Sequence, residues 1–376
     1  MEFRDLKAQY RALKDEIDEA VHNVLVSGKY IMGPQVKELE NQLADYVGVK
    51  HCISCANGTD ALQLALMAWD ISAGDAVFVA DFTFFASAEV VSAVGAHPIF
   101  VDVDANTFNM DAQDLECAIK RVIEEGKYAP KAVIAVNLFG LPADYEKIRA
   151  VCEKYNLKLL EDAAQGFGGR IGEQRACSFG DISTTSFFPA KPLGCYGDGG
   201  AIFTDNDEWA QLLRSYSVHG KGTEKYDNVR IGMNSRLDTI QAAILLIKLK
   251  AFDTYELKDV TEAAALYTQL LSDIPVIKPF IPQGYFSSWA QYSIMLKNEA
   301  ERNSLKKYLE EQGIPSMIYY PKPMHAQTAF FETEQQNVCA AATDICKRIL
   351  SLPLSPYIKK ADIESVCENV KGYMEK

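Results

Sequence analysis

The chain has 376 residues, of which 48% are hydrophobic and 24% charged, a composition typical of a globular protein with one large and one smaller domain. Its net charge of −13 argues against a nucleic-acid partner, because no basic face is evident to neutralise phosphates. The first residues carry charges where a signal peptide needs an apolar run, and no apolar run reaches membrane-spanning length. We therefore expect a cytoplasmic protein with no membrane partner.

The first two predicted helices cover about residues 11–26 and 35–46, where apolar residues recur at helical spacing. The turn-rich loop between them contains two glycines and Tyr30. Such a loop is typical of a ligand contact or of a simple helix–helix corner, and both interpretations remain open at this point.

From residue 50 onward, short apolar runs alternate with helical stretches, which predicts an α/β fold with a mainly parallel sheet covered on both faces. Ligands of such sheets bind beyond the carboxyl ends of the strands, so the residues that follow each strand are the candidates for a site. The seven predicted strands are 50–55, 76–80, 98–102, 132–137, 158–162, 182–187 and 201–204. Helices separating the first five are predicted at 60–69, 84–94, 111–124 and 143–154.

The first predicted strand contains Cys52 and Cys55 in a C-x-x-C pattern, which is typical of a redox or zinc site. The run 51–56 is apolar, however, and no second cysteine pair stands at zinc-ligand spacing. Free cysteine is a common core residue. We expect core packing here and no metal site.

Gly58 and Thr59 follow the first strand where a helix begins. The free N–H groups and the dipole of a helix N-terminus attract an anion such as phosphate. The alternative is plain N-capping by Thr59 or Asp60.

Aromatic and acidic side chains follow two other strands. Phe84 comes after the second strand and is expected either to pack in the core or to stack on a flat ring. Glu161 and Asp162 end the fifth strand and bring an acidic pair to the ligand edge of the sheet. A carboxylate there needs a cationic partner or donors, and a protonated ring nitrogen is one such partner.

The stretch Ser186–Ala201 contains Lys191 on a loop braced by prolines and glycines, just past a buried strand. Desolvation would lower the proton affinity of such a lysine and make it a nucleophile. Taken alone, the stretch also fits an ordinary loop lysine.

Beyond the sheet, Asn234 and Arg236 precede a long helix that ends at residue 249. The pattern then changes, which predicts a large domain over 1–250 and a small α+β domain over 251–376. Strands are predicted near 274–280 and 289–296 and a helix at 299–312. The small domain adds a loop with Tyr319, Tyr320 and His325 that could close over a site, although a lone histidine is more often structural.

A phosphate-suited helix start, an aromatic, a carboxylate and a lysine thus coincide at one sheet edge, and pyridoxal 5′-phosphate needs all four. Its phosphate would sit at Gly58, Thr59 and Ser186. Phe84 would stack on the ring. Asp162 would keep the ring nitrogen protonated, and Lys191 would form the Schiff base.

The sequence resembles the DegT/DnrJ/EryC1/StrS family of nucleotide-sugar aminotransferases across nearly its whole length. The stretches that carry the resemblance are Asn57–Leu62, Thr83–Phe84, Glu161–Gln165, Ser186–Ala201 and Gly232–Arg236. The resemblance implies the type I, aspartate-aminotransferase-like fold and the cofactor roles given above. It also implies that Gln165 lies near the ring hydroxyl, and that Asn234 reaches the phosphate from the other subunit of a homodimer with shared active sites.

The resemblance further implies that L-glutamate donates an amino group to a keto nucleotide sugar, with pyridoxamine 5′-phosphate as the aminated cofactor. Residues 187–201 resemble a subgroup that aminates C3 of UDP-linked 2-acetamido-2-deoxy-3-oxo-glucuronic acid, as in polysaccharide or lipopolysaccharide O-antigen synthesis. Candidate substrate residues are Tyr30, Arg236, Tyr319, Tyr320 and His325.

Arg236 is expected to grip the uronate carboxylate or to pair with Asp238 at a helix cap. Alternatives for the activity are amination at C4, a dehydratase, in which histidine replaces the lysine at 191, or a lyase with a mobile nucleophilic cysteine such as Cys339.

Overall fold

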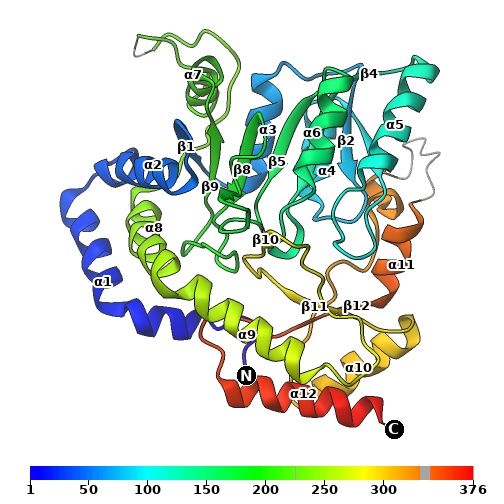
Figure 1. Cartoon of the computed structure of the whole chain (residues 1–376). Coiled ribbons are helices and arrows are strands. Elements are labelled where there is room, and N and C mark those ends of the chain that lie inside the picture. Colours follow the sequence, from blue (N-terminus) through cyan, green and yellow to red (C-terminus); the bar gives the residue numbers. More distant parts are fainter. Residues whose placement is uncertain (225, 331–338, 376) are drawn as a thin grey trace.

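The computed structural model describes residues 1–224, 226–330 and 339–375. A seven-stranded sheet lies at its centre (Figure 1), with the strand order β1-β9-β8-β5-β4-β2-β3. The strands are β1 (His51–Cys55), β2 (Asp75–Ala80), β3 (His97–Val101), β4 (Ala129–Val136), β5 (Lys158–Asp162), β8 (Ile182–Ser186) and β9 (Gly200–Thr204). All seven strands predicted from the apolar runs are therefore confirmed.

One strand, β9, runs antiparallel to both of its neighbours, β8 and β1, whereas the pairs from β8 to β3 are parallel. This arrangement brings the carboxyl ends of β1, β2, β4, β5 and β8 to one edge of the sheet. The loop between β8 and β9, which contains Lys191, leaves from that same edge. The topology thus gathers the predicted site residues in one place.

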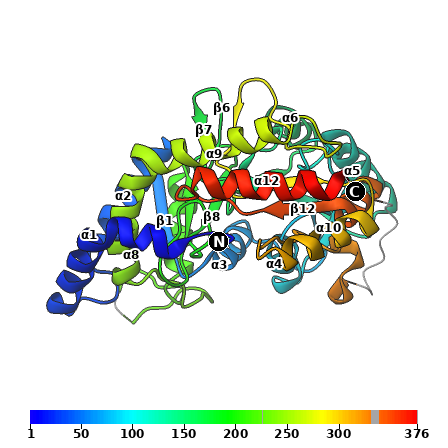
Figure 2. The same ribbon diagram turned by 90° about the horizontal axis from the view of Figure 1, so that it is seen from below.

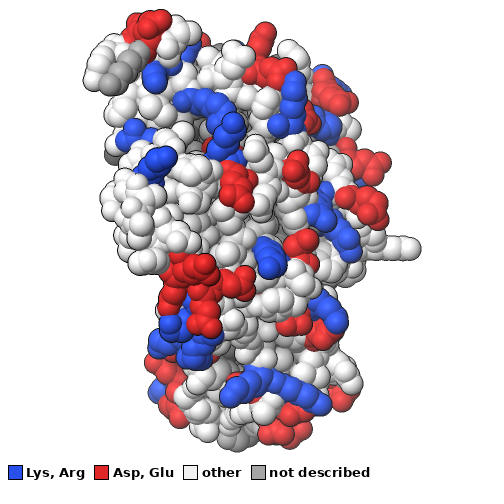
Figure 3. Space-filling view, turned by 90° about the vertical axis from the view of Figure 1, so that its left-hand side faces the viewer, with Lys and Arg blue, Asp and Glu red and all other residues white. Residues whose placement is uncertain are grey.

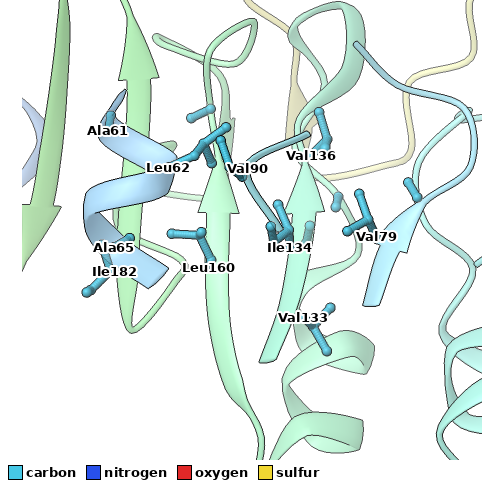
Figure 4. Packing of buried hydrophobic residues seen from close by; sticks show 14 of the residues in the cluster. Ala61, Leu62, Ala65, Val79, Val90, Val133, Ile134, Val136, Leu160 and Ile182 are labelled. Atoms are coloured by element: carbon cyan, nitrogen blue, oxygen red, sulfur yellow. The ribbon is translucent and has the colours of Figure 1, made fainter. Parts of the chain in front are cut away.

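Helices surround the sheet, and α3 packs on its centre. Ala61, Leu62 and Ala65 of α3 lie over Leu160 of β5 and Ile182 of β8 in the main hydrophobic cluster (Figure 4). The helices of this part are α1 (Leu6–Ser27), α2 (Pro34–Val47), α3 (Gly58–Ala68), α4 (Ala86–Ala93), α5 (Ala112–Glu125), α6 (Tyr145–Lys154), α7 (Asp207–Tyr216) and α8 (Thr239–Ala251). Among the described residues, no helix combines the length and the apolar character that crossing a bilayer requires.

A second hydrophobic cluster forms in the C-terminal part, between helices and the two-stranded sheet of β11 (Tyr292–Met295) and β12 (Ile349–Leu352). A π-helical turn at Phe252–Glu256 joins α8 to the first of these helices. The helices of this cluster are α9 (Leu257–Leu270), α10 (Glu299–Glu311) and α12 (Lys360–Met374). The remaining helix, α11 (Ala340–Arg348), packs its buried residues in the main cluster instead. The predicted domain division between residues 250 and 251 falls near the end of α8 and stays a prediction.

The strand predicted near 274–280 is wrong. Only an isolated bridge between Ile277 and Met295 forms there. The reason is local, because Pro275 and Pro279 lack the N–H groups that a strand ladder needs. The sequence analysis also missed a small sheet of three two-residue strands, β6 (Arg170–Ile171), β7 (Gln174–Arg175) and β10 (Tyr285–Phe286).

The cysteines are all unpaired, and Cys52 and Cys55 are buried in β1, where they belong to the main hydrophobic cluster. Burial raises the pKa of both thiols, which makes them poor nucleophiles. The expectation that this C-x-x-C pattern belongs to the core is confirmed.

Glu161 is fully buried at the end of β5 and accepts four hydrogen bonds. Its donors are Asn137 Nδ2 at 2.7 Å, Cys177 N at 2.8 Å, Phe179 N at 2.8 Å and Ser183 Oγ at 2.7 Å. Burial raises the pKa of Glu161, and the four donors oppose that rise. The carboxylate therefore fixes the segment before β8 to the end of β5.

We predict that Glu161→Gln lowers the free energy of unfolding by about 2 to 3 kcal/mol, because the new amide group would point a donor at another donor. Urea unfolding followed by circular dichroism measures this loss. Glu153→Gln, on the exposed side of α6, is the matched control and should change stability by less than about 0.5 kcal/mol. Equal stability of the two variants would contradict the role of Glu161.

Candidate active site

A cavity of about 630 Å³ opens at the edge of the sheet where the carboxyl ends of the strands meet. Most of the residues predicted from the sequence line it. They are Gly58, Thr59, Phe84, Asp162, Gln165, Ser186, Lys191, Tyr319 and Tyr320. The structure thus brings together the predicted lysine, carboxylate, aromatic and helix start, and two tyrosines from the C-terminal part of the chain.

The N-terminus of α3 points into this cavity beside Ser186. Asn57 is the N-cap, since its side chain accepts a hydrogen bond from Asp60 N. Capping by Thr59 or Asp60, the alternative left open above, is therefore wrong, and Thr59 faces the cavity instead. A side chain at Gly58 would place its Cβ 2.7 Å from the Cβ of Ser186, so only glycine allows this close approach.

Asp162 is 4% exposed, and both of its carboxylate oxygens are held in place. Oδ2 accepts a hydrogen bond from Ser87 Oγ at 2.7 Å, and Oδ1 accepts one from Ala164 N at 3.1 Å. Burial raises the pKa of Asp162, while these donors and the charge of Lys191 oppose the rise. The carboxylate is a fixed acceptor in an environment that favours a cationic partner.

Lys191 is held by its main chain, because its N–H donates to Phe188 O at 2.9 Å. Its Nζ lies 5.9 Å from the centre of the Phe84 ring. Burial lowers the pKa of the Lys191 amine, and the Asp162 carboxylate partly restores it. The neutral amine, which is the nucleophilic form, is thereby favoured relative to a lysine in water.

Phe84 is 52% exposed, so the alternative of core packing is wrong. Its ring lies 6.2 Å from that of Tyr320. Gln165 anchors this wall of the cavity, since its Nε2 donates to Tyr320 Oη at 3.1 Å and its Oε1 accepts from Phe139 N at 2.8 Å. Phe84, Tyr320 and Gln165 therefore form one wall of the cavity, in which the tyrosine is held by a hydrogen bond.

Tyr30, Asn234 and Arg236 do not line the cavity within the described chain. Arg236 donates a hydrogen bond to Asn234 Oδ1, and no ion pair joins it to Asp238 among the described residues, so the helix-cap alternative is wrong. The bridge between Ile31 and Asp238 places the Tyr30 loop beside these two residues. All three predicted residues thus share one surface region.

His325 is also outside the cavity. Its Nδ1 lies 2.6 Å from Asp81 Oδ2, and its backbone N–H donates to Asp81 Oδ1 at 2.8 Å. One ligand atom each of Asp81, His325 and buried Cys339 lies within 4.8 Å of the others. The 2.6 Å contact has the length of a charge-assisted hydrogen bond, so we interpret this cluster as a tie between the small domain and the end of β2.

Several residues of the site were not predicted. Ser87 holds Asp162, and Asn57, Asp198 and Gln291 line the cavity. Asn57 directly precedes Gly58 and Ser87 lies three residues after Phe84, so their position after a strand was an available signal. Gln291 comes from a distant part of the chain, and no local pattern marks it.

Comparisons with known proteins agree with this geometry. The model of the DegT/DnrJ/EryC1/StrS aminotransferase family matches residues 11–371. UDP-2-acetamido-2-deoxy-3-oxo-D-glucuronate aminotransferase of Pseudomonas aeruginosa is 43% identical and is matched over 98% of each chain. The crystal structure of a DegT DnrJ EryC1 StrS aminotransferase from Brucella abortus superposes with a TM-score of 0.97 at 48% identity, covering 100% of both chains.

A more distant solved structure is that of NtdA from Bacillus subtilis with bound cofactor PMP. It superposes with a TM-score of 0.91 at 27% identity and covers 100% of this chain and 85% of its own. The type I fold expected from the sequence is therefore confirmed.

The tie between His325 and Asp81 predicts a pH-dependent stability. The Asp81 carboxylate raises the pKa of His325 above its ordinary value of 6.5. The stabilisation should be complete below pH 6.5 and should be lost as the pH rises through the higher pKa of the folded state. Urea unfolding at a series of pH values measures it.

His325→Asn should remove this pH dependence and cost about 2 kcal/mol at pH 6, because Asp81 loses a charged donor. The matched control is His22→Asn, since His22 is exposed on α1. A stability profile of His325→Asn that parallels the parent profile above pH 6 would contradict this assignment.

Proposed function

The chain belongs to the DegT/DnrJ/EryC1/StrS aminotransferase family, and from this premise we propose that it moves the amino group of L-glutamate onto C3 of a UDP-linked 2-acetamido-2-deoxy-3-oxo-glucuronic acid. The observation that carries the proposal is the cavity that combines Lys191, Asp162 and the N-terminus of α3. The 43% identity to the Pseudomonas aeruginosa aminotransferase supports the choice of sugar.

The cavity fits pyridoxal 5′-phosphate as the cofactor. The close approach at Gly58 leaves the N–H groups of α3 and the Ser186 hydroxyl free to hold a phosphate. Phe84 exposes its ring to the same cavity, and Asp162 offers a buried carboxylate to a protonated ring nitrogen. When bound, the cofactor supplies an electron sink that stabilises negative charge on the substrate carbon.

Lys191 is the proposed acid–base group. Its lowered pKa favours the neutral amine relative to a lysine in water, and the neutral amine is the form that can accept a proton from the α-carbon of the amino donor. In the second half-reaction the same amine returns a proton to C3 of the sugar. Asp162, fixed by Ser87, holds its charge in place throughout. Overall, the donor exchanges its amino group for an oxygen, and the sugar exchanges its C3 oxygen for the amino group.

Tyr319 and Tyr320 are the proposed sugar contacts, because both line the cavity. Burial raises the pKa of both phenols, so both remain hydrogen-bond donors at neutral pH. Arg236 is the proposed ligand of the uronate carboxylate, with a guanidinium geometry suited to it. Within one chain, Arg236 lies outside the cavity, so this role requires a second subunit.

A homodimer with shared active sites would supply that second subunit. Large apolar side chains are exposed on two neighbouring loops that flank Asn234 and Arg236. They are Tyr30, Ile31, Met32, Tyr226, Val229 and Ile231, with exposed fractions between 47% and 90%. Figure 3, which views the side of α1 and α2, shows a wide area with few charged side chains. Such patches are typical of subunit interfaces, and we place Asn234, Arg236 and Tyr30 at or near the partner's site.

The alternative activities have weaker support. A dehydratase is disfavoured because position 191 is a lysine and not a histidine. A lyase with Cys339 as nucleophile is disfavoured because this thiol is 1% exposed and burial raises its pKa. Amination at C4 is disfavoured by the name of the Pseudomonas aeruginosa relative, which has a 3-oxo substrate. Work in the cytoplasm on precursors of a surface polysaccharide such as O-antigen fits a nucleotide-linked sugar.

The first test is the absorption spectrum of the protein loaded with pyridoxal phosphate, before and after addition of L-glutamate. We predict conversion to the pyridoxamine form with release of 2-oxoglutarate. Lys191→Ala should bind the cofactor noncovalently and lose at least about 10³-fold of the turnover, since the proton-transfer group is absent. Turnover by Lys191→Ala at the parent rate, or a spectrum indifferent to glutamate, would refute the proposal.

The shared site is tested by mixing two inactive proteins, Lys191→Ala and Arg236→Ala, after unfolding and refolding them together. In a twofold-symmetric dimer each mixed dimer contains one site with both changes and one intact site. The mixture should therefore recover about a quarter of the parent activity with the keto sugar. No recovery, with dimers present by light scattering, would place Arg236 in the site of its own chain or outside both sites.

A further inference from the structure

Two residues ahead of α1 contact the active site. Arg4 Nη2 donates a hydrogen bond to the main-chain oxygen of Lys191 at 3.0 Å. The oxygen of Phe3 accepts a hydrogen bond from Leu354 N at 3.1 Å, and its ring meets Tyr319 edge-on at 6.1 Å between centroids. Figure 2 shows this segment running inward from α1 to the middle of the molecule.

Asp5 fixes the direction of this segment, because its side chain caps α1 by accepting from Ala8 N at 2.8 Å. The helix that follows is itself anchored, since Leu13 and Ile17 pack against Ile244 and Ala251 of α8. The anchored helix α1 thus holds Arg4 beside the Lys191 loop. With the bond from Lys191 N to Phe188 O, both main-chain polar groups of Lys191 are bound.

The charged groups around Arg4 affect the protonation of the Lys191 amine. The groups that face the guanidinium are Lys191, Lys248 of α8 and Glu256 of the π-helical turn. Glu256 is 1% exposed and also accepts hydrogen bonds from Gln9 and Tyr357. Arg4 Nη1 is buried without a hydrogen-bond partner among the described residues, so part of its charge is not neutralised locally.

We propose that Arg4 is a positioning residue for Lys191, whose guanidinium both fixes the main chain of the lysine loop and places a second positive charge behind the amine. Like charges repel, so Arg4 favours the neutral form of the Lys191 amine. Asp162, on the cavity side, favours the charged form. The lowered pKa of Lys191, caused first by burial and further by Arg4, agrees with this geometry. The effect of Arg4 on Lys191 does not depend on the proposed function; only the role of Lys191 in turnover rests on it.

The test uses the protein without cofactor and measures Lys191 itself. Acetic anhydride labels the amine only in its neutral form, and peptide mass spectrometry follows the labelling of Lys191 against a reference amine over a range of pH. We expect Arg4→Met and Arg4→Gln to move the midpoint upward and to slow labelling at pH 8 by about three- to tenfold. Arg4→Lys, which keeps the charge, should stay within about twofold of the parent protein.

Arg11→Met is the matched control, because Arg11 lies on α1, the helix that follows Arg4, with 66% of its side chain exposed, and it should leave the midpoint unchanged. Thermal unfolding of each variant separates this effect from loss of the fold. An unchanged midpoint in either folded neutral variant would overturn the proposal, as would an equal shift in Arg4→Lys.

The glutamate half-reaction of the loaded parent protein is measured separately. A shifted midpoint without that half-reaction would refute the proposed function and leave the role of Arg4 intact.

Discussion

The alternation of side chains along β5 determines the layout of the site. Adjacent residues of a strand point to opposite faces, so Glu161 and Asp162 cannot serve the same surface. As a result, one of the two neighbouring carboxylates stabilises the fold and the other lines the cavity. Glu161 collects four donors and fixes the approach to β8, whereas Asp162 faces the cavity with two donors and remains available to a cation.

Burial and charge have opposing effects on the ionisation of Asp162 and Lys191. Burial acts in opposite directions on a carboxyl and an amine, raising the pKa of Asp162 and lowering that of Lys191. Each group also moderates the effect on the other through its charge. The pKa of the carboxyl and that of the amine are thus shifted toward each other by burial, a pattern typical of groups at functional sites.

The sequence predicted the sheet and the cavity lining well, because both depend on local signals. Apolar runs mark buried strands, and the residues that follow parallel strands converge on one edge, which explains the success with Gly58, Asp162 and Lys191. The contacts that the sequence did not predict are nonlocal. Asp81 and His325 are 244 positions apart, and Arg4 and Lys191 are 187 apart. The periodicity of the sequence does not predict such pairs, because they form only when segments far apart in the chain pack together. Tyr30, Asn234 and Arg236 likewise lie outside the cavity of their own chain, and no local pattern in the sequence predicted this separation.

The packing of α1 against α8 has a consequence for the order in which the molecule assembles during synthesis. The buried apolar residues of α1, Leu13 and Ile17, pack mainly against α8, at Ile244 and Ala251. A ribosome makes α1 first, so this helix emerges long before its partners exist. The sheet, whose strands all precede α8, can form in that interval. Arrival of α8 then docks the first helix and brings Arg4 to the lysine loop, so that this wall of the cavity is completed after the framework that supports it.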